Sequence, residues 1–187
     1  MLFPLNADKM VTRCRIVPQN GDLWWTQRKK AKFSKRLKGQ TQTMFEGMHS
    51  HNIDPKGRLI VPVKFREKLG DEFFVTAGLD GCLIIYAQKE WKAFEEKLSA
   101  LPAMTNPAAR KLQRFFLANA ARCECDKQGR IIVPQHLREL GGIENEVVFT
   151  GLGSRIELWS RSRWLEAGTY EDINQIASSM ADLGISL

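Results

Sequence analysis

The sequence lacks the features that mark membrane and secreted proteins. No stretch of its 187 residues approaches the run of about 18 apolar side chains that a membrane-spanning helix needs. The first ten residues, MLFPLNADKM, lack the basic start and long apolar stretch of a secretory signal. Hydrophobic residues make up 43% and charged residues 26%, a balance typical of globular proteins rather than disordered ones. We therefore expect a folded protein located in the cytoplasm.

Metal-binding patterns are also missing. The chain has four cysteines: Cys14, Cys82, Cys123 and Cys125. The only close pair is the Cys-Glu-Cys segment, and no histidine follows it at the spacing of a zinc site. We interpret the four as reduced thiols that act as small apolar side chains. His49 and His51 alternate as neighbours on a strand do, without further ligands, so we expect no metal and no cofactor.

Sequence signatures of common enzymes are absent as well. The chain contains no Gly-x-Ser-x-Gly, no glycine-rich phosphate loop with its lysine, and no His-Glu-x-x-His. The acidic pair Glu95-Glu96 falls on the polar face of a predicted helix, where solvated carboxylates are expected. The sequence thus predicts a protein that is not an enzyme and has no catalytic residues.

Positive charge is concentrated near one end of the chain. The net charge is +7, from 28 Lys/Arg and 21 Asp/Glu. Residues 1–43 hold ten Lys/Arg and two Asp, a charge of +8, so the remaining 144 residues carry −1. The overall balance indicates an anionic partner. Outside residues 1–43, a nucleic-acid surface would need local placement of a few cations.

Residues 1–43 differ in composition from the rest. The stretch 28–38 is a basic run with sparse apolar residues, and no helical or strand periodicity continues around it. Two interpretations stay open. The segment is a disordered basic extension that adds non-specific attraction to phosphates. Alternatively it is an upstream extension produced by a misassigned start, because Met44 opens a self-sufficient sequence.

An internal repeat is the most informative feature of the chain. Segment 54–62, DPKGRLIVP, recurs 72 residues later as segment 126–134, DKQGRIIVP. In each copy we expect a hairpin turn, in which Asp54 or Asp126 accepts backbone N–H groups and the glycine takes a positive φ. The apolar run after the arginine predicts a strand buried on both faces, which the proline ends.

The two copies continue alike behind the proline. A short helix is predicted first, then a strand at 72–76 or 146–150. Segment 78–86 or 151–159 follows, with a second hairpin turn at 79–82 or 152–155, and then a helix led by Trp91 or Trp164. The residues of the short helices expected over the core are Phe65, Leu69, Leu137 and Leu140. Arg66 and Arg138 on these helices are interpreted as surface charges, with a phosphate contact as the alternative.

The connecting and final segments favour helices. Trp91, Phe94 and Leu98 have amphipathic spacing, and Asn106 before Pro107 indicates the N-cap of a further helix. We divide the chain into a basic N-terminal extension (1–43), a first module (48–95), a helical linker (96–123), a second module (124–167) and a C-terminal helix (168–187). Each module has only about 45 residues, which is marginal for an independent core, so we expect modules to pack together in pairs.

The doubled Asp-x-x-Gly-Arg-hydrophobic-hydrophobic-Val-Pro pattern resembles the swapped-hairpin modules of AbrB and SpoVT type. Two such modules at this spacing, opened by MFEG at 44–47, are similar to the MraZ family of bacterial regulators from residue 44 to about 183. The resemblance implies an α+β fold. Two tandem swapped-hairpin β modules would form a small double-psi-like barrel core, with flanking and C-terminal helices. Glu46 stands where the family commonly has a basic residue, and residues 1–43 have no family counterpart.

The same resemblance implies a function. Members of the family bind short direct repeats in double-stranded DNA upstream of the division and cell-wall gene cluster, usually at their own promoter, and regulate its transcription. They assemble into cytoplasmic, ring-shaped homo-oligomers and associate with the nucleoid. Their DNA contacts lie in the Asp-x-x-Gly-Arg loops. In this chain that implies a DNA-binding set of Lys56, Gly57, Arg58, Lys127, Gln128, Gly129 and Arg130.

The chemistry of these loops fits DNA binding. The planar fork of arginine can bind guanine O6 and N7, and a two-stranded ribbon is narrow enough for the major groove. Because each loop offers few cations, a ring that presents many loops would supply the affinity through multivalency. Arg58 and Arg130 could instead brace the turn by pairing with Asp54 or Asp126, and the loop lysines could be solvated turn residues.

Two competing functions stay open. An oligomeric scaffold could bind a protein partner through the same loops without reading DNA, and the steep salt dependence of phosphate binding would separate these cases. Toxin–antitoxin regulation is suggested by other swapped-hairpin proteins. Those usually carry one module and a disordered toxin-binding tail, whereas this chain has two modules.

Overall fold

The computed structural model describes residues 44–167 and 172–182. The interpretations of residues 1–43, and those that fall on 168–171 and 183–187, lie outside this range. The first copy contains β1 (Phe45–Asn52), β2 (Arg58–Ile60), α2 (Val63–Leu69), β3 (Glu72–Ala77), β4 (Leu83–Ala87) and α3 (Gln88–Ser99). After α4 (Pro107–Ala118), the second contains β5 (Ala121–Glu124), β6 (Arg130–Ile132), α5 (Gln135–Gly141), β7 (Glu146–Gly153), β8 (Arg155–Ser160) and α6 (Arg161–Ala167), followed by α7 (Ile173–Asp182).

Both copies have the same order of elements, as the repeat predicts: strand, turn, short strand, short helix, two strands and a helix. The short helices α2 and α5 begin directly after Pro62 and Pro134. The predicted N-cap of α4 is confirmed, because the Asn106 side chain accepts the backbone N–H of Ala108 at 2.9 Å and that of Ala109 at 3.3 Å.

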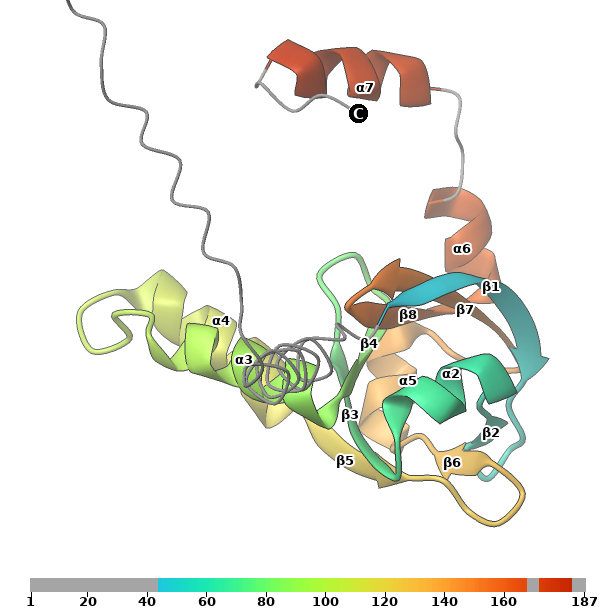
Figure 1. Cartoon of the computed structure of the whole chain (residues 1–187). Coiled ribbons are helices and arrows are strands. Elements are labelled where there is room, and N and C mark those ends of the chain that lie inside the picture. Colours follow the sequence, from blue (N-terminus) through green and yellow to red (C-terminus); the bar gives the residue numbers. More distant parts are fainter. Residues whose placement is uncertain (1–43, 168–171, 183–187) are drawn as a thin grey trace, which may run out of the picture. The chain divides into compact units, whose positions relative to one another are not determined.

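Strands of the two copies share one antiparallel sheet. Its order is β1-β7-β8-β4-β3-β5, and β2 pairs with β6 in a separate two-stranded ribbon. The first strand of each copy is held by the other copy, since β1 pairs with β7 and β5 pairs with β3. The ribbon lies at one end of the sheet, away from α3 and α4 (Figure 1). The two copies therefore form one interlocked α+β unit.

The six-stranded sheet is covered on both faces. One face carries Phe73, Leu83 and Phe149 in the main core, which the short helices and the inner side of the ribbon complete. The other face carries Tyr86 and Trp159 in a second cluster with Trp91 of α3. Burial of Trp91 confirms the amphipathic spacing predicted for that helix. The alternation of the strands thus divides their side chains between two layers of helices.

The ribbon differs from the strand predicted after each arginine. Leu59 and Ile131 are buried, at 0% and 1% exposure, but Ile60 is 49% exposed and Ile132 65%. The expectation of a strand buried on both faces is therefore wrong. The reason is topological: in the described part of the chain, the ribbon is packed by the core on its inner side and by no layer on its outer side.

Two local expectations also need correction. The turn at 54–58 joins strands that meet only at the isolated bridge between Ile53 and Leu59, because β2 pairs with the other copy instead of with β1. Leu140 is 43% exposed and does not cover the core. The position 72 residues after Leu69 is Gly141, where an added Cβ would lie 3.2 Å from the Ile143 side chain, so Ile143 takes that core position.

Candidate functional site

The Asp54 carboxylate organises the first turn. Its Oδ1 accepts the backbone N–H of Lys56 at 3.0 Å and that of Arg58 at 2.8 Å. The backbone N–H of Gly57 donates to the Asp54 carbonyl at 2.8 Å, and Gly57 has a φ of 78° that a side chain would strain. These bonds hold the turn closed through groups that are only two to four residues apart.

The second turn has the same geometry. Oδ1 of Asp126 accepts the backbone N–H of Gln128 at 2.8 Å and that of Arg130 at 2.9 Å. The N–H of Gly129 donates to the Asp126 carbonyl at 2.8 Å, and the φ of Gly129 is 74°. The repeat in sequence is therefore a repeat in hydrogen bonding, residue for residue.

Each aspartate also orients its arginine. Nε of Arg58 donates to Oδ2 of Asp54 at 2.5 Å, and Nε of Arg130 donates to Oδ2 of Asp126 at 2.8 Å. The arginine side chains keep 41% and 30% exposure. A pair this exposed adds little to stability, so its main effect is to limit the directions in which the guanidinium points. The remaining guanidinium N–H groups stay available to a partner.

Hydrogen bonding shifts the acidity of both aspartates. The pKa of Asp54 lies below its ordinary value of 3.8, chiefly because the backbone N–H of Arg58 stabilises the carboxylate. The pKa of Asp126 is lowered in the same way, first by the backbone N–H of Arg130 and then by its side chain. Both carboxylates are therefore charged at neutral pH, as the ion pairs require.

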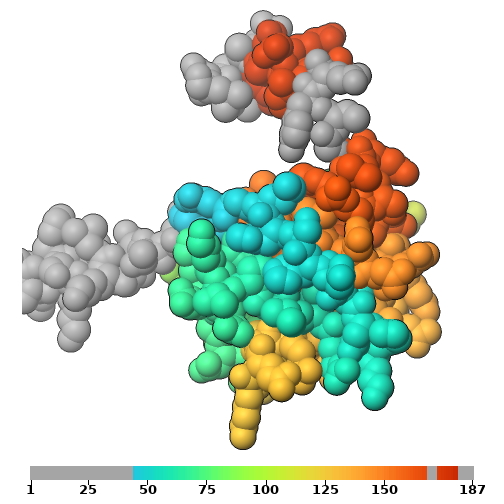
Figure 2. Space-filling view, turned by 90° about the vertical axis from the view of Figure 1, so that its right-hand side faces the viewer, coloured from blue at the N-terminus to red at the C-terminus, as the bar shows by residue number. Residues whose placement is uncertain are grey.

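The two turns meet through the ribbon. β2 and β6 are antiparallel, with Arg58 opposite Ile132, Leu59 opposite Ile131 and Ile60 opposite Arg130. The central pair, Leu59 and Ile131, points into the core. The outward face therefore carries the other four side chains, Arg58, Ile60, Arg130 and Ile132. The turn at 54–58 (blue-green) and the turn at 126–130 (gold) project on the same side of the molecule (Figure 2). One arginine from each copy is thus displayed on one surface, which the spacing in sequence did not reveal.

The other loop residues fall into two groups. The side chains of Lys56, Lys127 and Gln128 are exposed around the ribbon. Gly57 and Gly129 are buried. Their backbone is held by the opposite copy: the N–H of Val61 donates to Gly129 O at 3.0 Å, and the N–H of Val133 donates to Gly57 O at 2.8 Å. Each turn is therefore fastened by the strand end of the other copy.

Arg66 and Arg138 are not simple surface charges. Both are half-buried. An added Cβ at Gly57 would lie 3.1 Å from Nε of Arg138, and one at Gly129 would overlap the guanidinium of Arg66. Nε of Arg138 is buried without a hydrogen-bond partner in the described structure. The signal in sequence was their equivalent place in both copies, four residues after Pro62 and four residues after Pro134.

A groove beside the ribbon gathers further charge. It has a volume of about 260 Å³ and is lined by Arg58, Arg122, Cys123, Glu124, Asp126, Arg130, Ile131 and Ile132. Arg122, which the sequence analysis did not single out, pairs with Glu72 and lies 3.6 Å from Glu124. The position of Arg122 is occupied by Ser50 in the first copy, 72 residues earlier. The second copy therefore adds one arginine to this groove, and Glu72 and Glu124 balance its charge.

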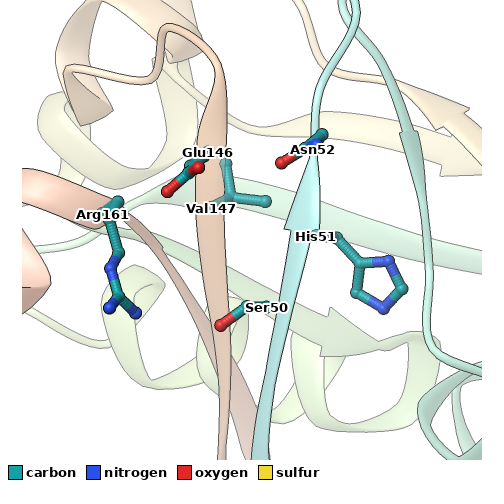
Figure 3. Close-up of a pocket in the computed structure, with 6 residues that line it drawn as sticks. All are labelled: Ser50, His51, Asn52, Glu146, Val147 and Arg161. Atoms are coloured by element: carbon teal, nitrogen blue, oxygen red, sulfur yellow. The ribbon is translucent and has the colours of Figure 1, made fainter.

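A second pocket lies between the edge strand β1, its neighbour β7 and the start of α6. It has a volume of about 550 Å³ and is lined by Ser50, His51, Asn52, Glu146, Val147 and Arg161. Glu146 and Arg161 lie on one side of strand β7, and the imidazole of His51 points away from them (Figure 3). Burial, followed by the charge of His49, lowers the pKa of His51 below 6.5. These side chains do not converge on one point at which a reaction could occur.

Several classes of site are missing from the described ranges. No group of three or more His, Cys, Asp or Glu residues there could hold a metal ion. Cys82, Cys123 and Cys125 are free thiols, and burial raises the pKa of Cys82 to about 12 and that of Cys123 to about 11, so both stay protonated. Among helices α2 to α7, none has both the length and the apolar composition needed to cross a membrane.

Fold and site together define an α+β protein of two interlocked modules that displays a paired arginine ribbon. A family model described as "MraZ protein, putative antitoxin-like" matches residues 44–115 and again 116–182. The chain belongs to the MraZ family. The two matches meet inside α4, and residues 1–43 lie outside both.

Relatives agree with this membership over nearly their whole length. A protein of Lachnoclostridium phytofermentans is 51% identical over 143 residues, 76% of this chain and 99% of the relative. One of Heliobacterium modesticaldum is 53% identical over 135 residues, 70% of this chain and 94% of the relative. One of Carboxydothermus hydrogenoformans is 50% identical over 141 residues, 74% and 98%. Each of these relatives is named transcriptional regulator MraZ.

Proposed function

We propose that this protein is a transcriptional regulator that binds double-stranded DNA with the outer face of the β2–β6 ribbon and its two turns. The observation that carries the proposal is the pair Arg58 and Arg130, one from each copy, on one exposed ribbon face, each oriented by its own aspartate. The proposed interface consists of Lys56, Gly57, Arg58, Lys127, Gln128, Gly129 and Arg130, with Asp54 and Asp126 shaping the turns. The two buried glycines would contribute through the turn conformation.

Physical chemistry supports base reading by this face. A two-stranded ribbon can enter the major groove, where guanine presents the O6 and N7 acceptors. Arg58 uses its Nε on Asp54, so its terminal N–H groups can donate to a base edge. A guanidinium already held in place loses less rotamer freedom on binding. The exposed lysines Lys56 and Lys127 would contact phosphates and set the register.

One chain offers few cations for this task. Residues 44–187 carry a net charge of −1, so a single ribbon should bind weakly. We propose that the protein forms a ring-shaped homo-oligomer that engages several short direct repeats at once, at its own promoter and in the division and cell-wall gene cluster. Cytoplasmic location and association with the nucleoid follow from such a role. The relatives' name as transcriptional regulators supports this proposal.

The exchange of strands between copies supports the finer description of the fold. β1 and β5 each pair with the opposite copy, and β2 pairs with β6. This is the pattern we propose as two swapped-hairpin modules around a double-psi-like core. We propose modules at 48–95 and 124–167, joined by a helical linker at 96–123. With these limits, each turn lies in the same module as the short helix that follows it.

The test is fluorescence-anisotropy binding to the DNA directly upstream of the protein's own gene and to a scrambled duplex. The variant Arg58→Ala/Arg130→Ala should lose at least tenfold in affinity for the upstream DNA and lose the preference over scrambled DNA. Lys89→Ala/Lys92→Ala on α3 removes the same charge from exposed positions of a helix away from the ribbon and should keep both. Light scattering checks that oligomeric state is equal. A wild-type protein without any preference for the upstream DNA would instead favour a protein-binding scaffold.

A further inference from the structure

The outward face of the ribbon is not purely cationic. Ile60 is 49% exposed and Ile132 is 65% exposed, although both are large β-branched side chains. Because they alternate with the buried Leu59 and Ile131, they stand on the same face as the two arginines. Each copy contributes one exposed isoleucine at the equivalent position, two residues after its arginine.

The register places each isoleucine beside the arginine of the other copy. Arg58 is directly opposite Ile132, and Ile60 is directly opposite Arg130. Side chains in such cross-strand pairs have Cβ atoms about 4.5–5.5 Å apart. The ribbon therefore displays two units, each with a hydrogen-bonding fork next to an apolar branched group, and each unit is assembled from both copies.

The ligand that complements one unit has hydrogen-bond acceptors next to a small apolar group. The major groove of DNA offers this combination, because guanine presents O6 and N7 and thymine presents its 5-methyl group. Exposed cations around the face, from Lys56 and Lys127, favour a polyanion over an apolar protein surface.

We propose that Ile60 and Ile132 are specificity-determining residues that contact thymine 5-methyl groups next to the guanines bound by Arg130 and Arg58. This inference rests on the proposed function and extends it from guanine reading to reading of the neighbouring base. Ile132 is the more exposed of the two and contributes the larger part of the effect.

The thymine methyl can be removed without changing the protein. The upstream duplex is synthesised once with thymidine and once with deoxyuridine in its place, which deletes the 5-methyl group and keeps base pairing. Binding of the full chain is measured by anisotropy. Wild-type protein should bind the thymidine duplex about fourfold more tightly for each methyl contacted, the factor expected for burial of one carbon.

Variants assign this difference to particular residues. Ile132→Ala and the double variant Ile60→Ala/Ile132→Ala should bind both duplexes with nearly equal affinity. Ile132→Val, which removes a single carbon, should keep part of the difference. Leu79→Ala is the matched control, since Leu79 is 70% exposed outside the ribbon, and it should keep the wild-type ratio.

Two results would overturn the inference. The first is that wild-type protein prefers the upstream DNA over scrambled DNA but binds the thymidine and deoxyuridine duplexes equally. Isoleucine variants that lose affinity but keep the wild-type ratio would equally remove the methyl contact and assign these side chains to another interface. Failure of the proposed function itself is distinguishable, because in that case wild-type protein shows no preference for the upstream DNA at all.

Discussion

Asp54 and Asp126 each bind two backbone N–H groups and one guanidinium through a single carboxylate. These hydrogen bonds join residues only two or four positions apart. They can be predicted from the local sequence, because the side chain of an aspartate in a turn can accept the backbone N–H groups that follow it. The local sequence does not specify what surrounds the guanidinium groups of Arg58 and Arg130. That depends on the residue opposite each arginine on the other strand of the ribbon.

Acid should weaken the fold through these two carboxylates. Both carboxylates have a pKa below 3.8 in the folded protein, so at acidic pH the folded state binds fewer protons than the unfolded state does. Their contribution to stability is present above the unfolded pKa near 3.8 and is lost as the pH falls through the folded pKa. We expect the urea midpoint of wild type to fall more steeply between pH 5 and pH 3 (about the range of these titrations) than that of Asp54→Asn/Asp126→Asn.

Other carboxylates titrate in the same range, so only the difference between the two proteins carries the result. Glu95→Gln/Glu96→Gln, which changes the same charge on α3, serves as the control and should follow wild type. Parallel pH profiles for wild type and the aspartate variant would show that the turn carboxylates contribute nothing to acid stability.

At the scale of elements, the turns and short helices of the two copies hold one another. Val133 donates to Gly57 O and Val61 donates to Gly129 O, while Arg138 and Arg66 lie against the same two glycines. The arrangement is nearly symmetric, but the atom closest to each glycine differs. A Cβ at Gly57 would lie 2.8 Å from the backbone oxygen of Val133, whereas one at Gly129 would first meet the guanidinium of Arg66.

This difference predicts unequal effects of the same substitution. Both glycines have φ near 75°, so alanine strains either turn by about 1–3 kcal/mol. Gly57→Ala must also displace the backbone of Val133, which adds roughly 1 kcal/mol or more to the loss of stability. In Gly129→Ala, the end of the Arg66 side chain can move away from the new methyl group. We therefore expect Gly57→Ala to have the lower free energy of unfolding in urea denaturation. The opposite order would mean that Arg66 is held as rigidly as the backbone of Val133.

At the scale of the whole molecule, charge is divided between a segment of +8 and a remainder of −1. Phosphate contacts release counterions, so the slope of log K against log salt reports how many cations bind DNA. We expect the chain that starts at Met44 to show a slope smaller by several units than the full chain. Affinity for scrambled DNA should fall more than affinity for the upstream DNA, so the preference between them should rise.

Anisotropy titrations between 50 and 300 mM salt, a range of roughly two- to threefold around physiological strength, check this prediction on both proteins. Equal slopes would show that residues 1–43 make no phosphate contacts. A shorter chain that lost its preference altogether would place specific binding in those residues and contradict the ribbon as the reading surface.

The sequence by itself determined the repeat, the two aspartate turns, the N-cap at Asn106, the buried face of α3 and membership in the MraZ family. Each of these rests on residues close together in the chain or on a pattern that recurs intact. It did not determine that β2 and β6 have one exposed face, that Ile143 replaces Leu140 in the core, or that Arg66 and Arg138 reach the opposite turn.

Only the tertiary structure decided those features. They depend on which copy each strand pairs with, and such pairs join residues far apart in the chain, as between Arg58 and Ile132, which are 74 positions apart. A local apolar run is compatible with one buried face or with two, because burial is set by the layer that packs on it. Interlocking of the copies therefore turned two separate motifs into one ribbon that displays two arginines and two isoleucines on a single face.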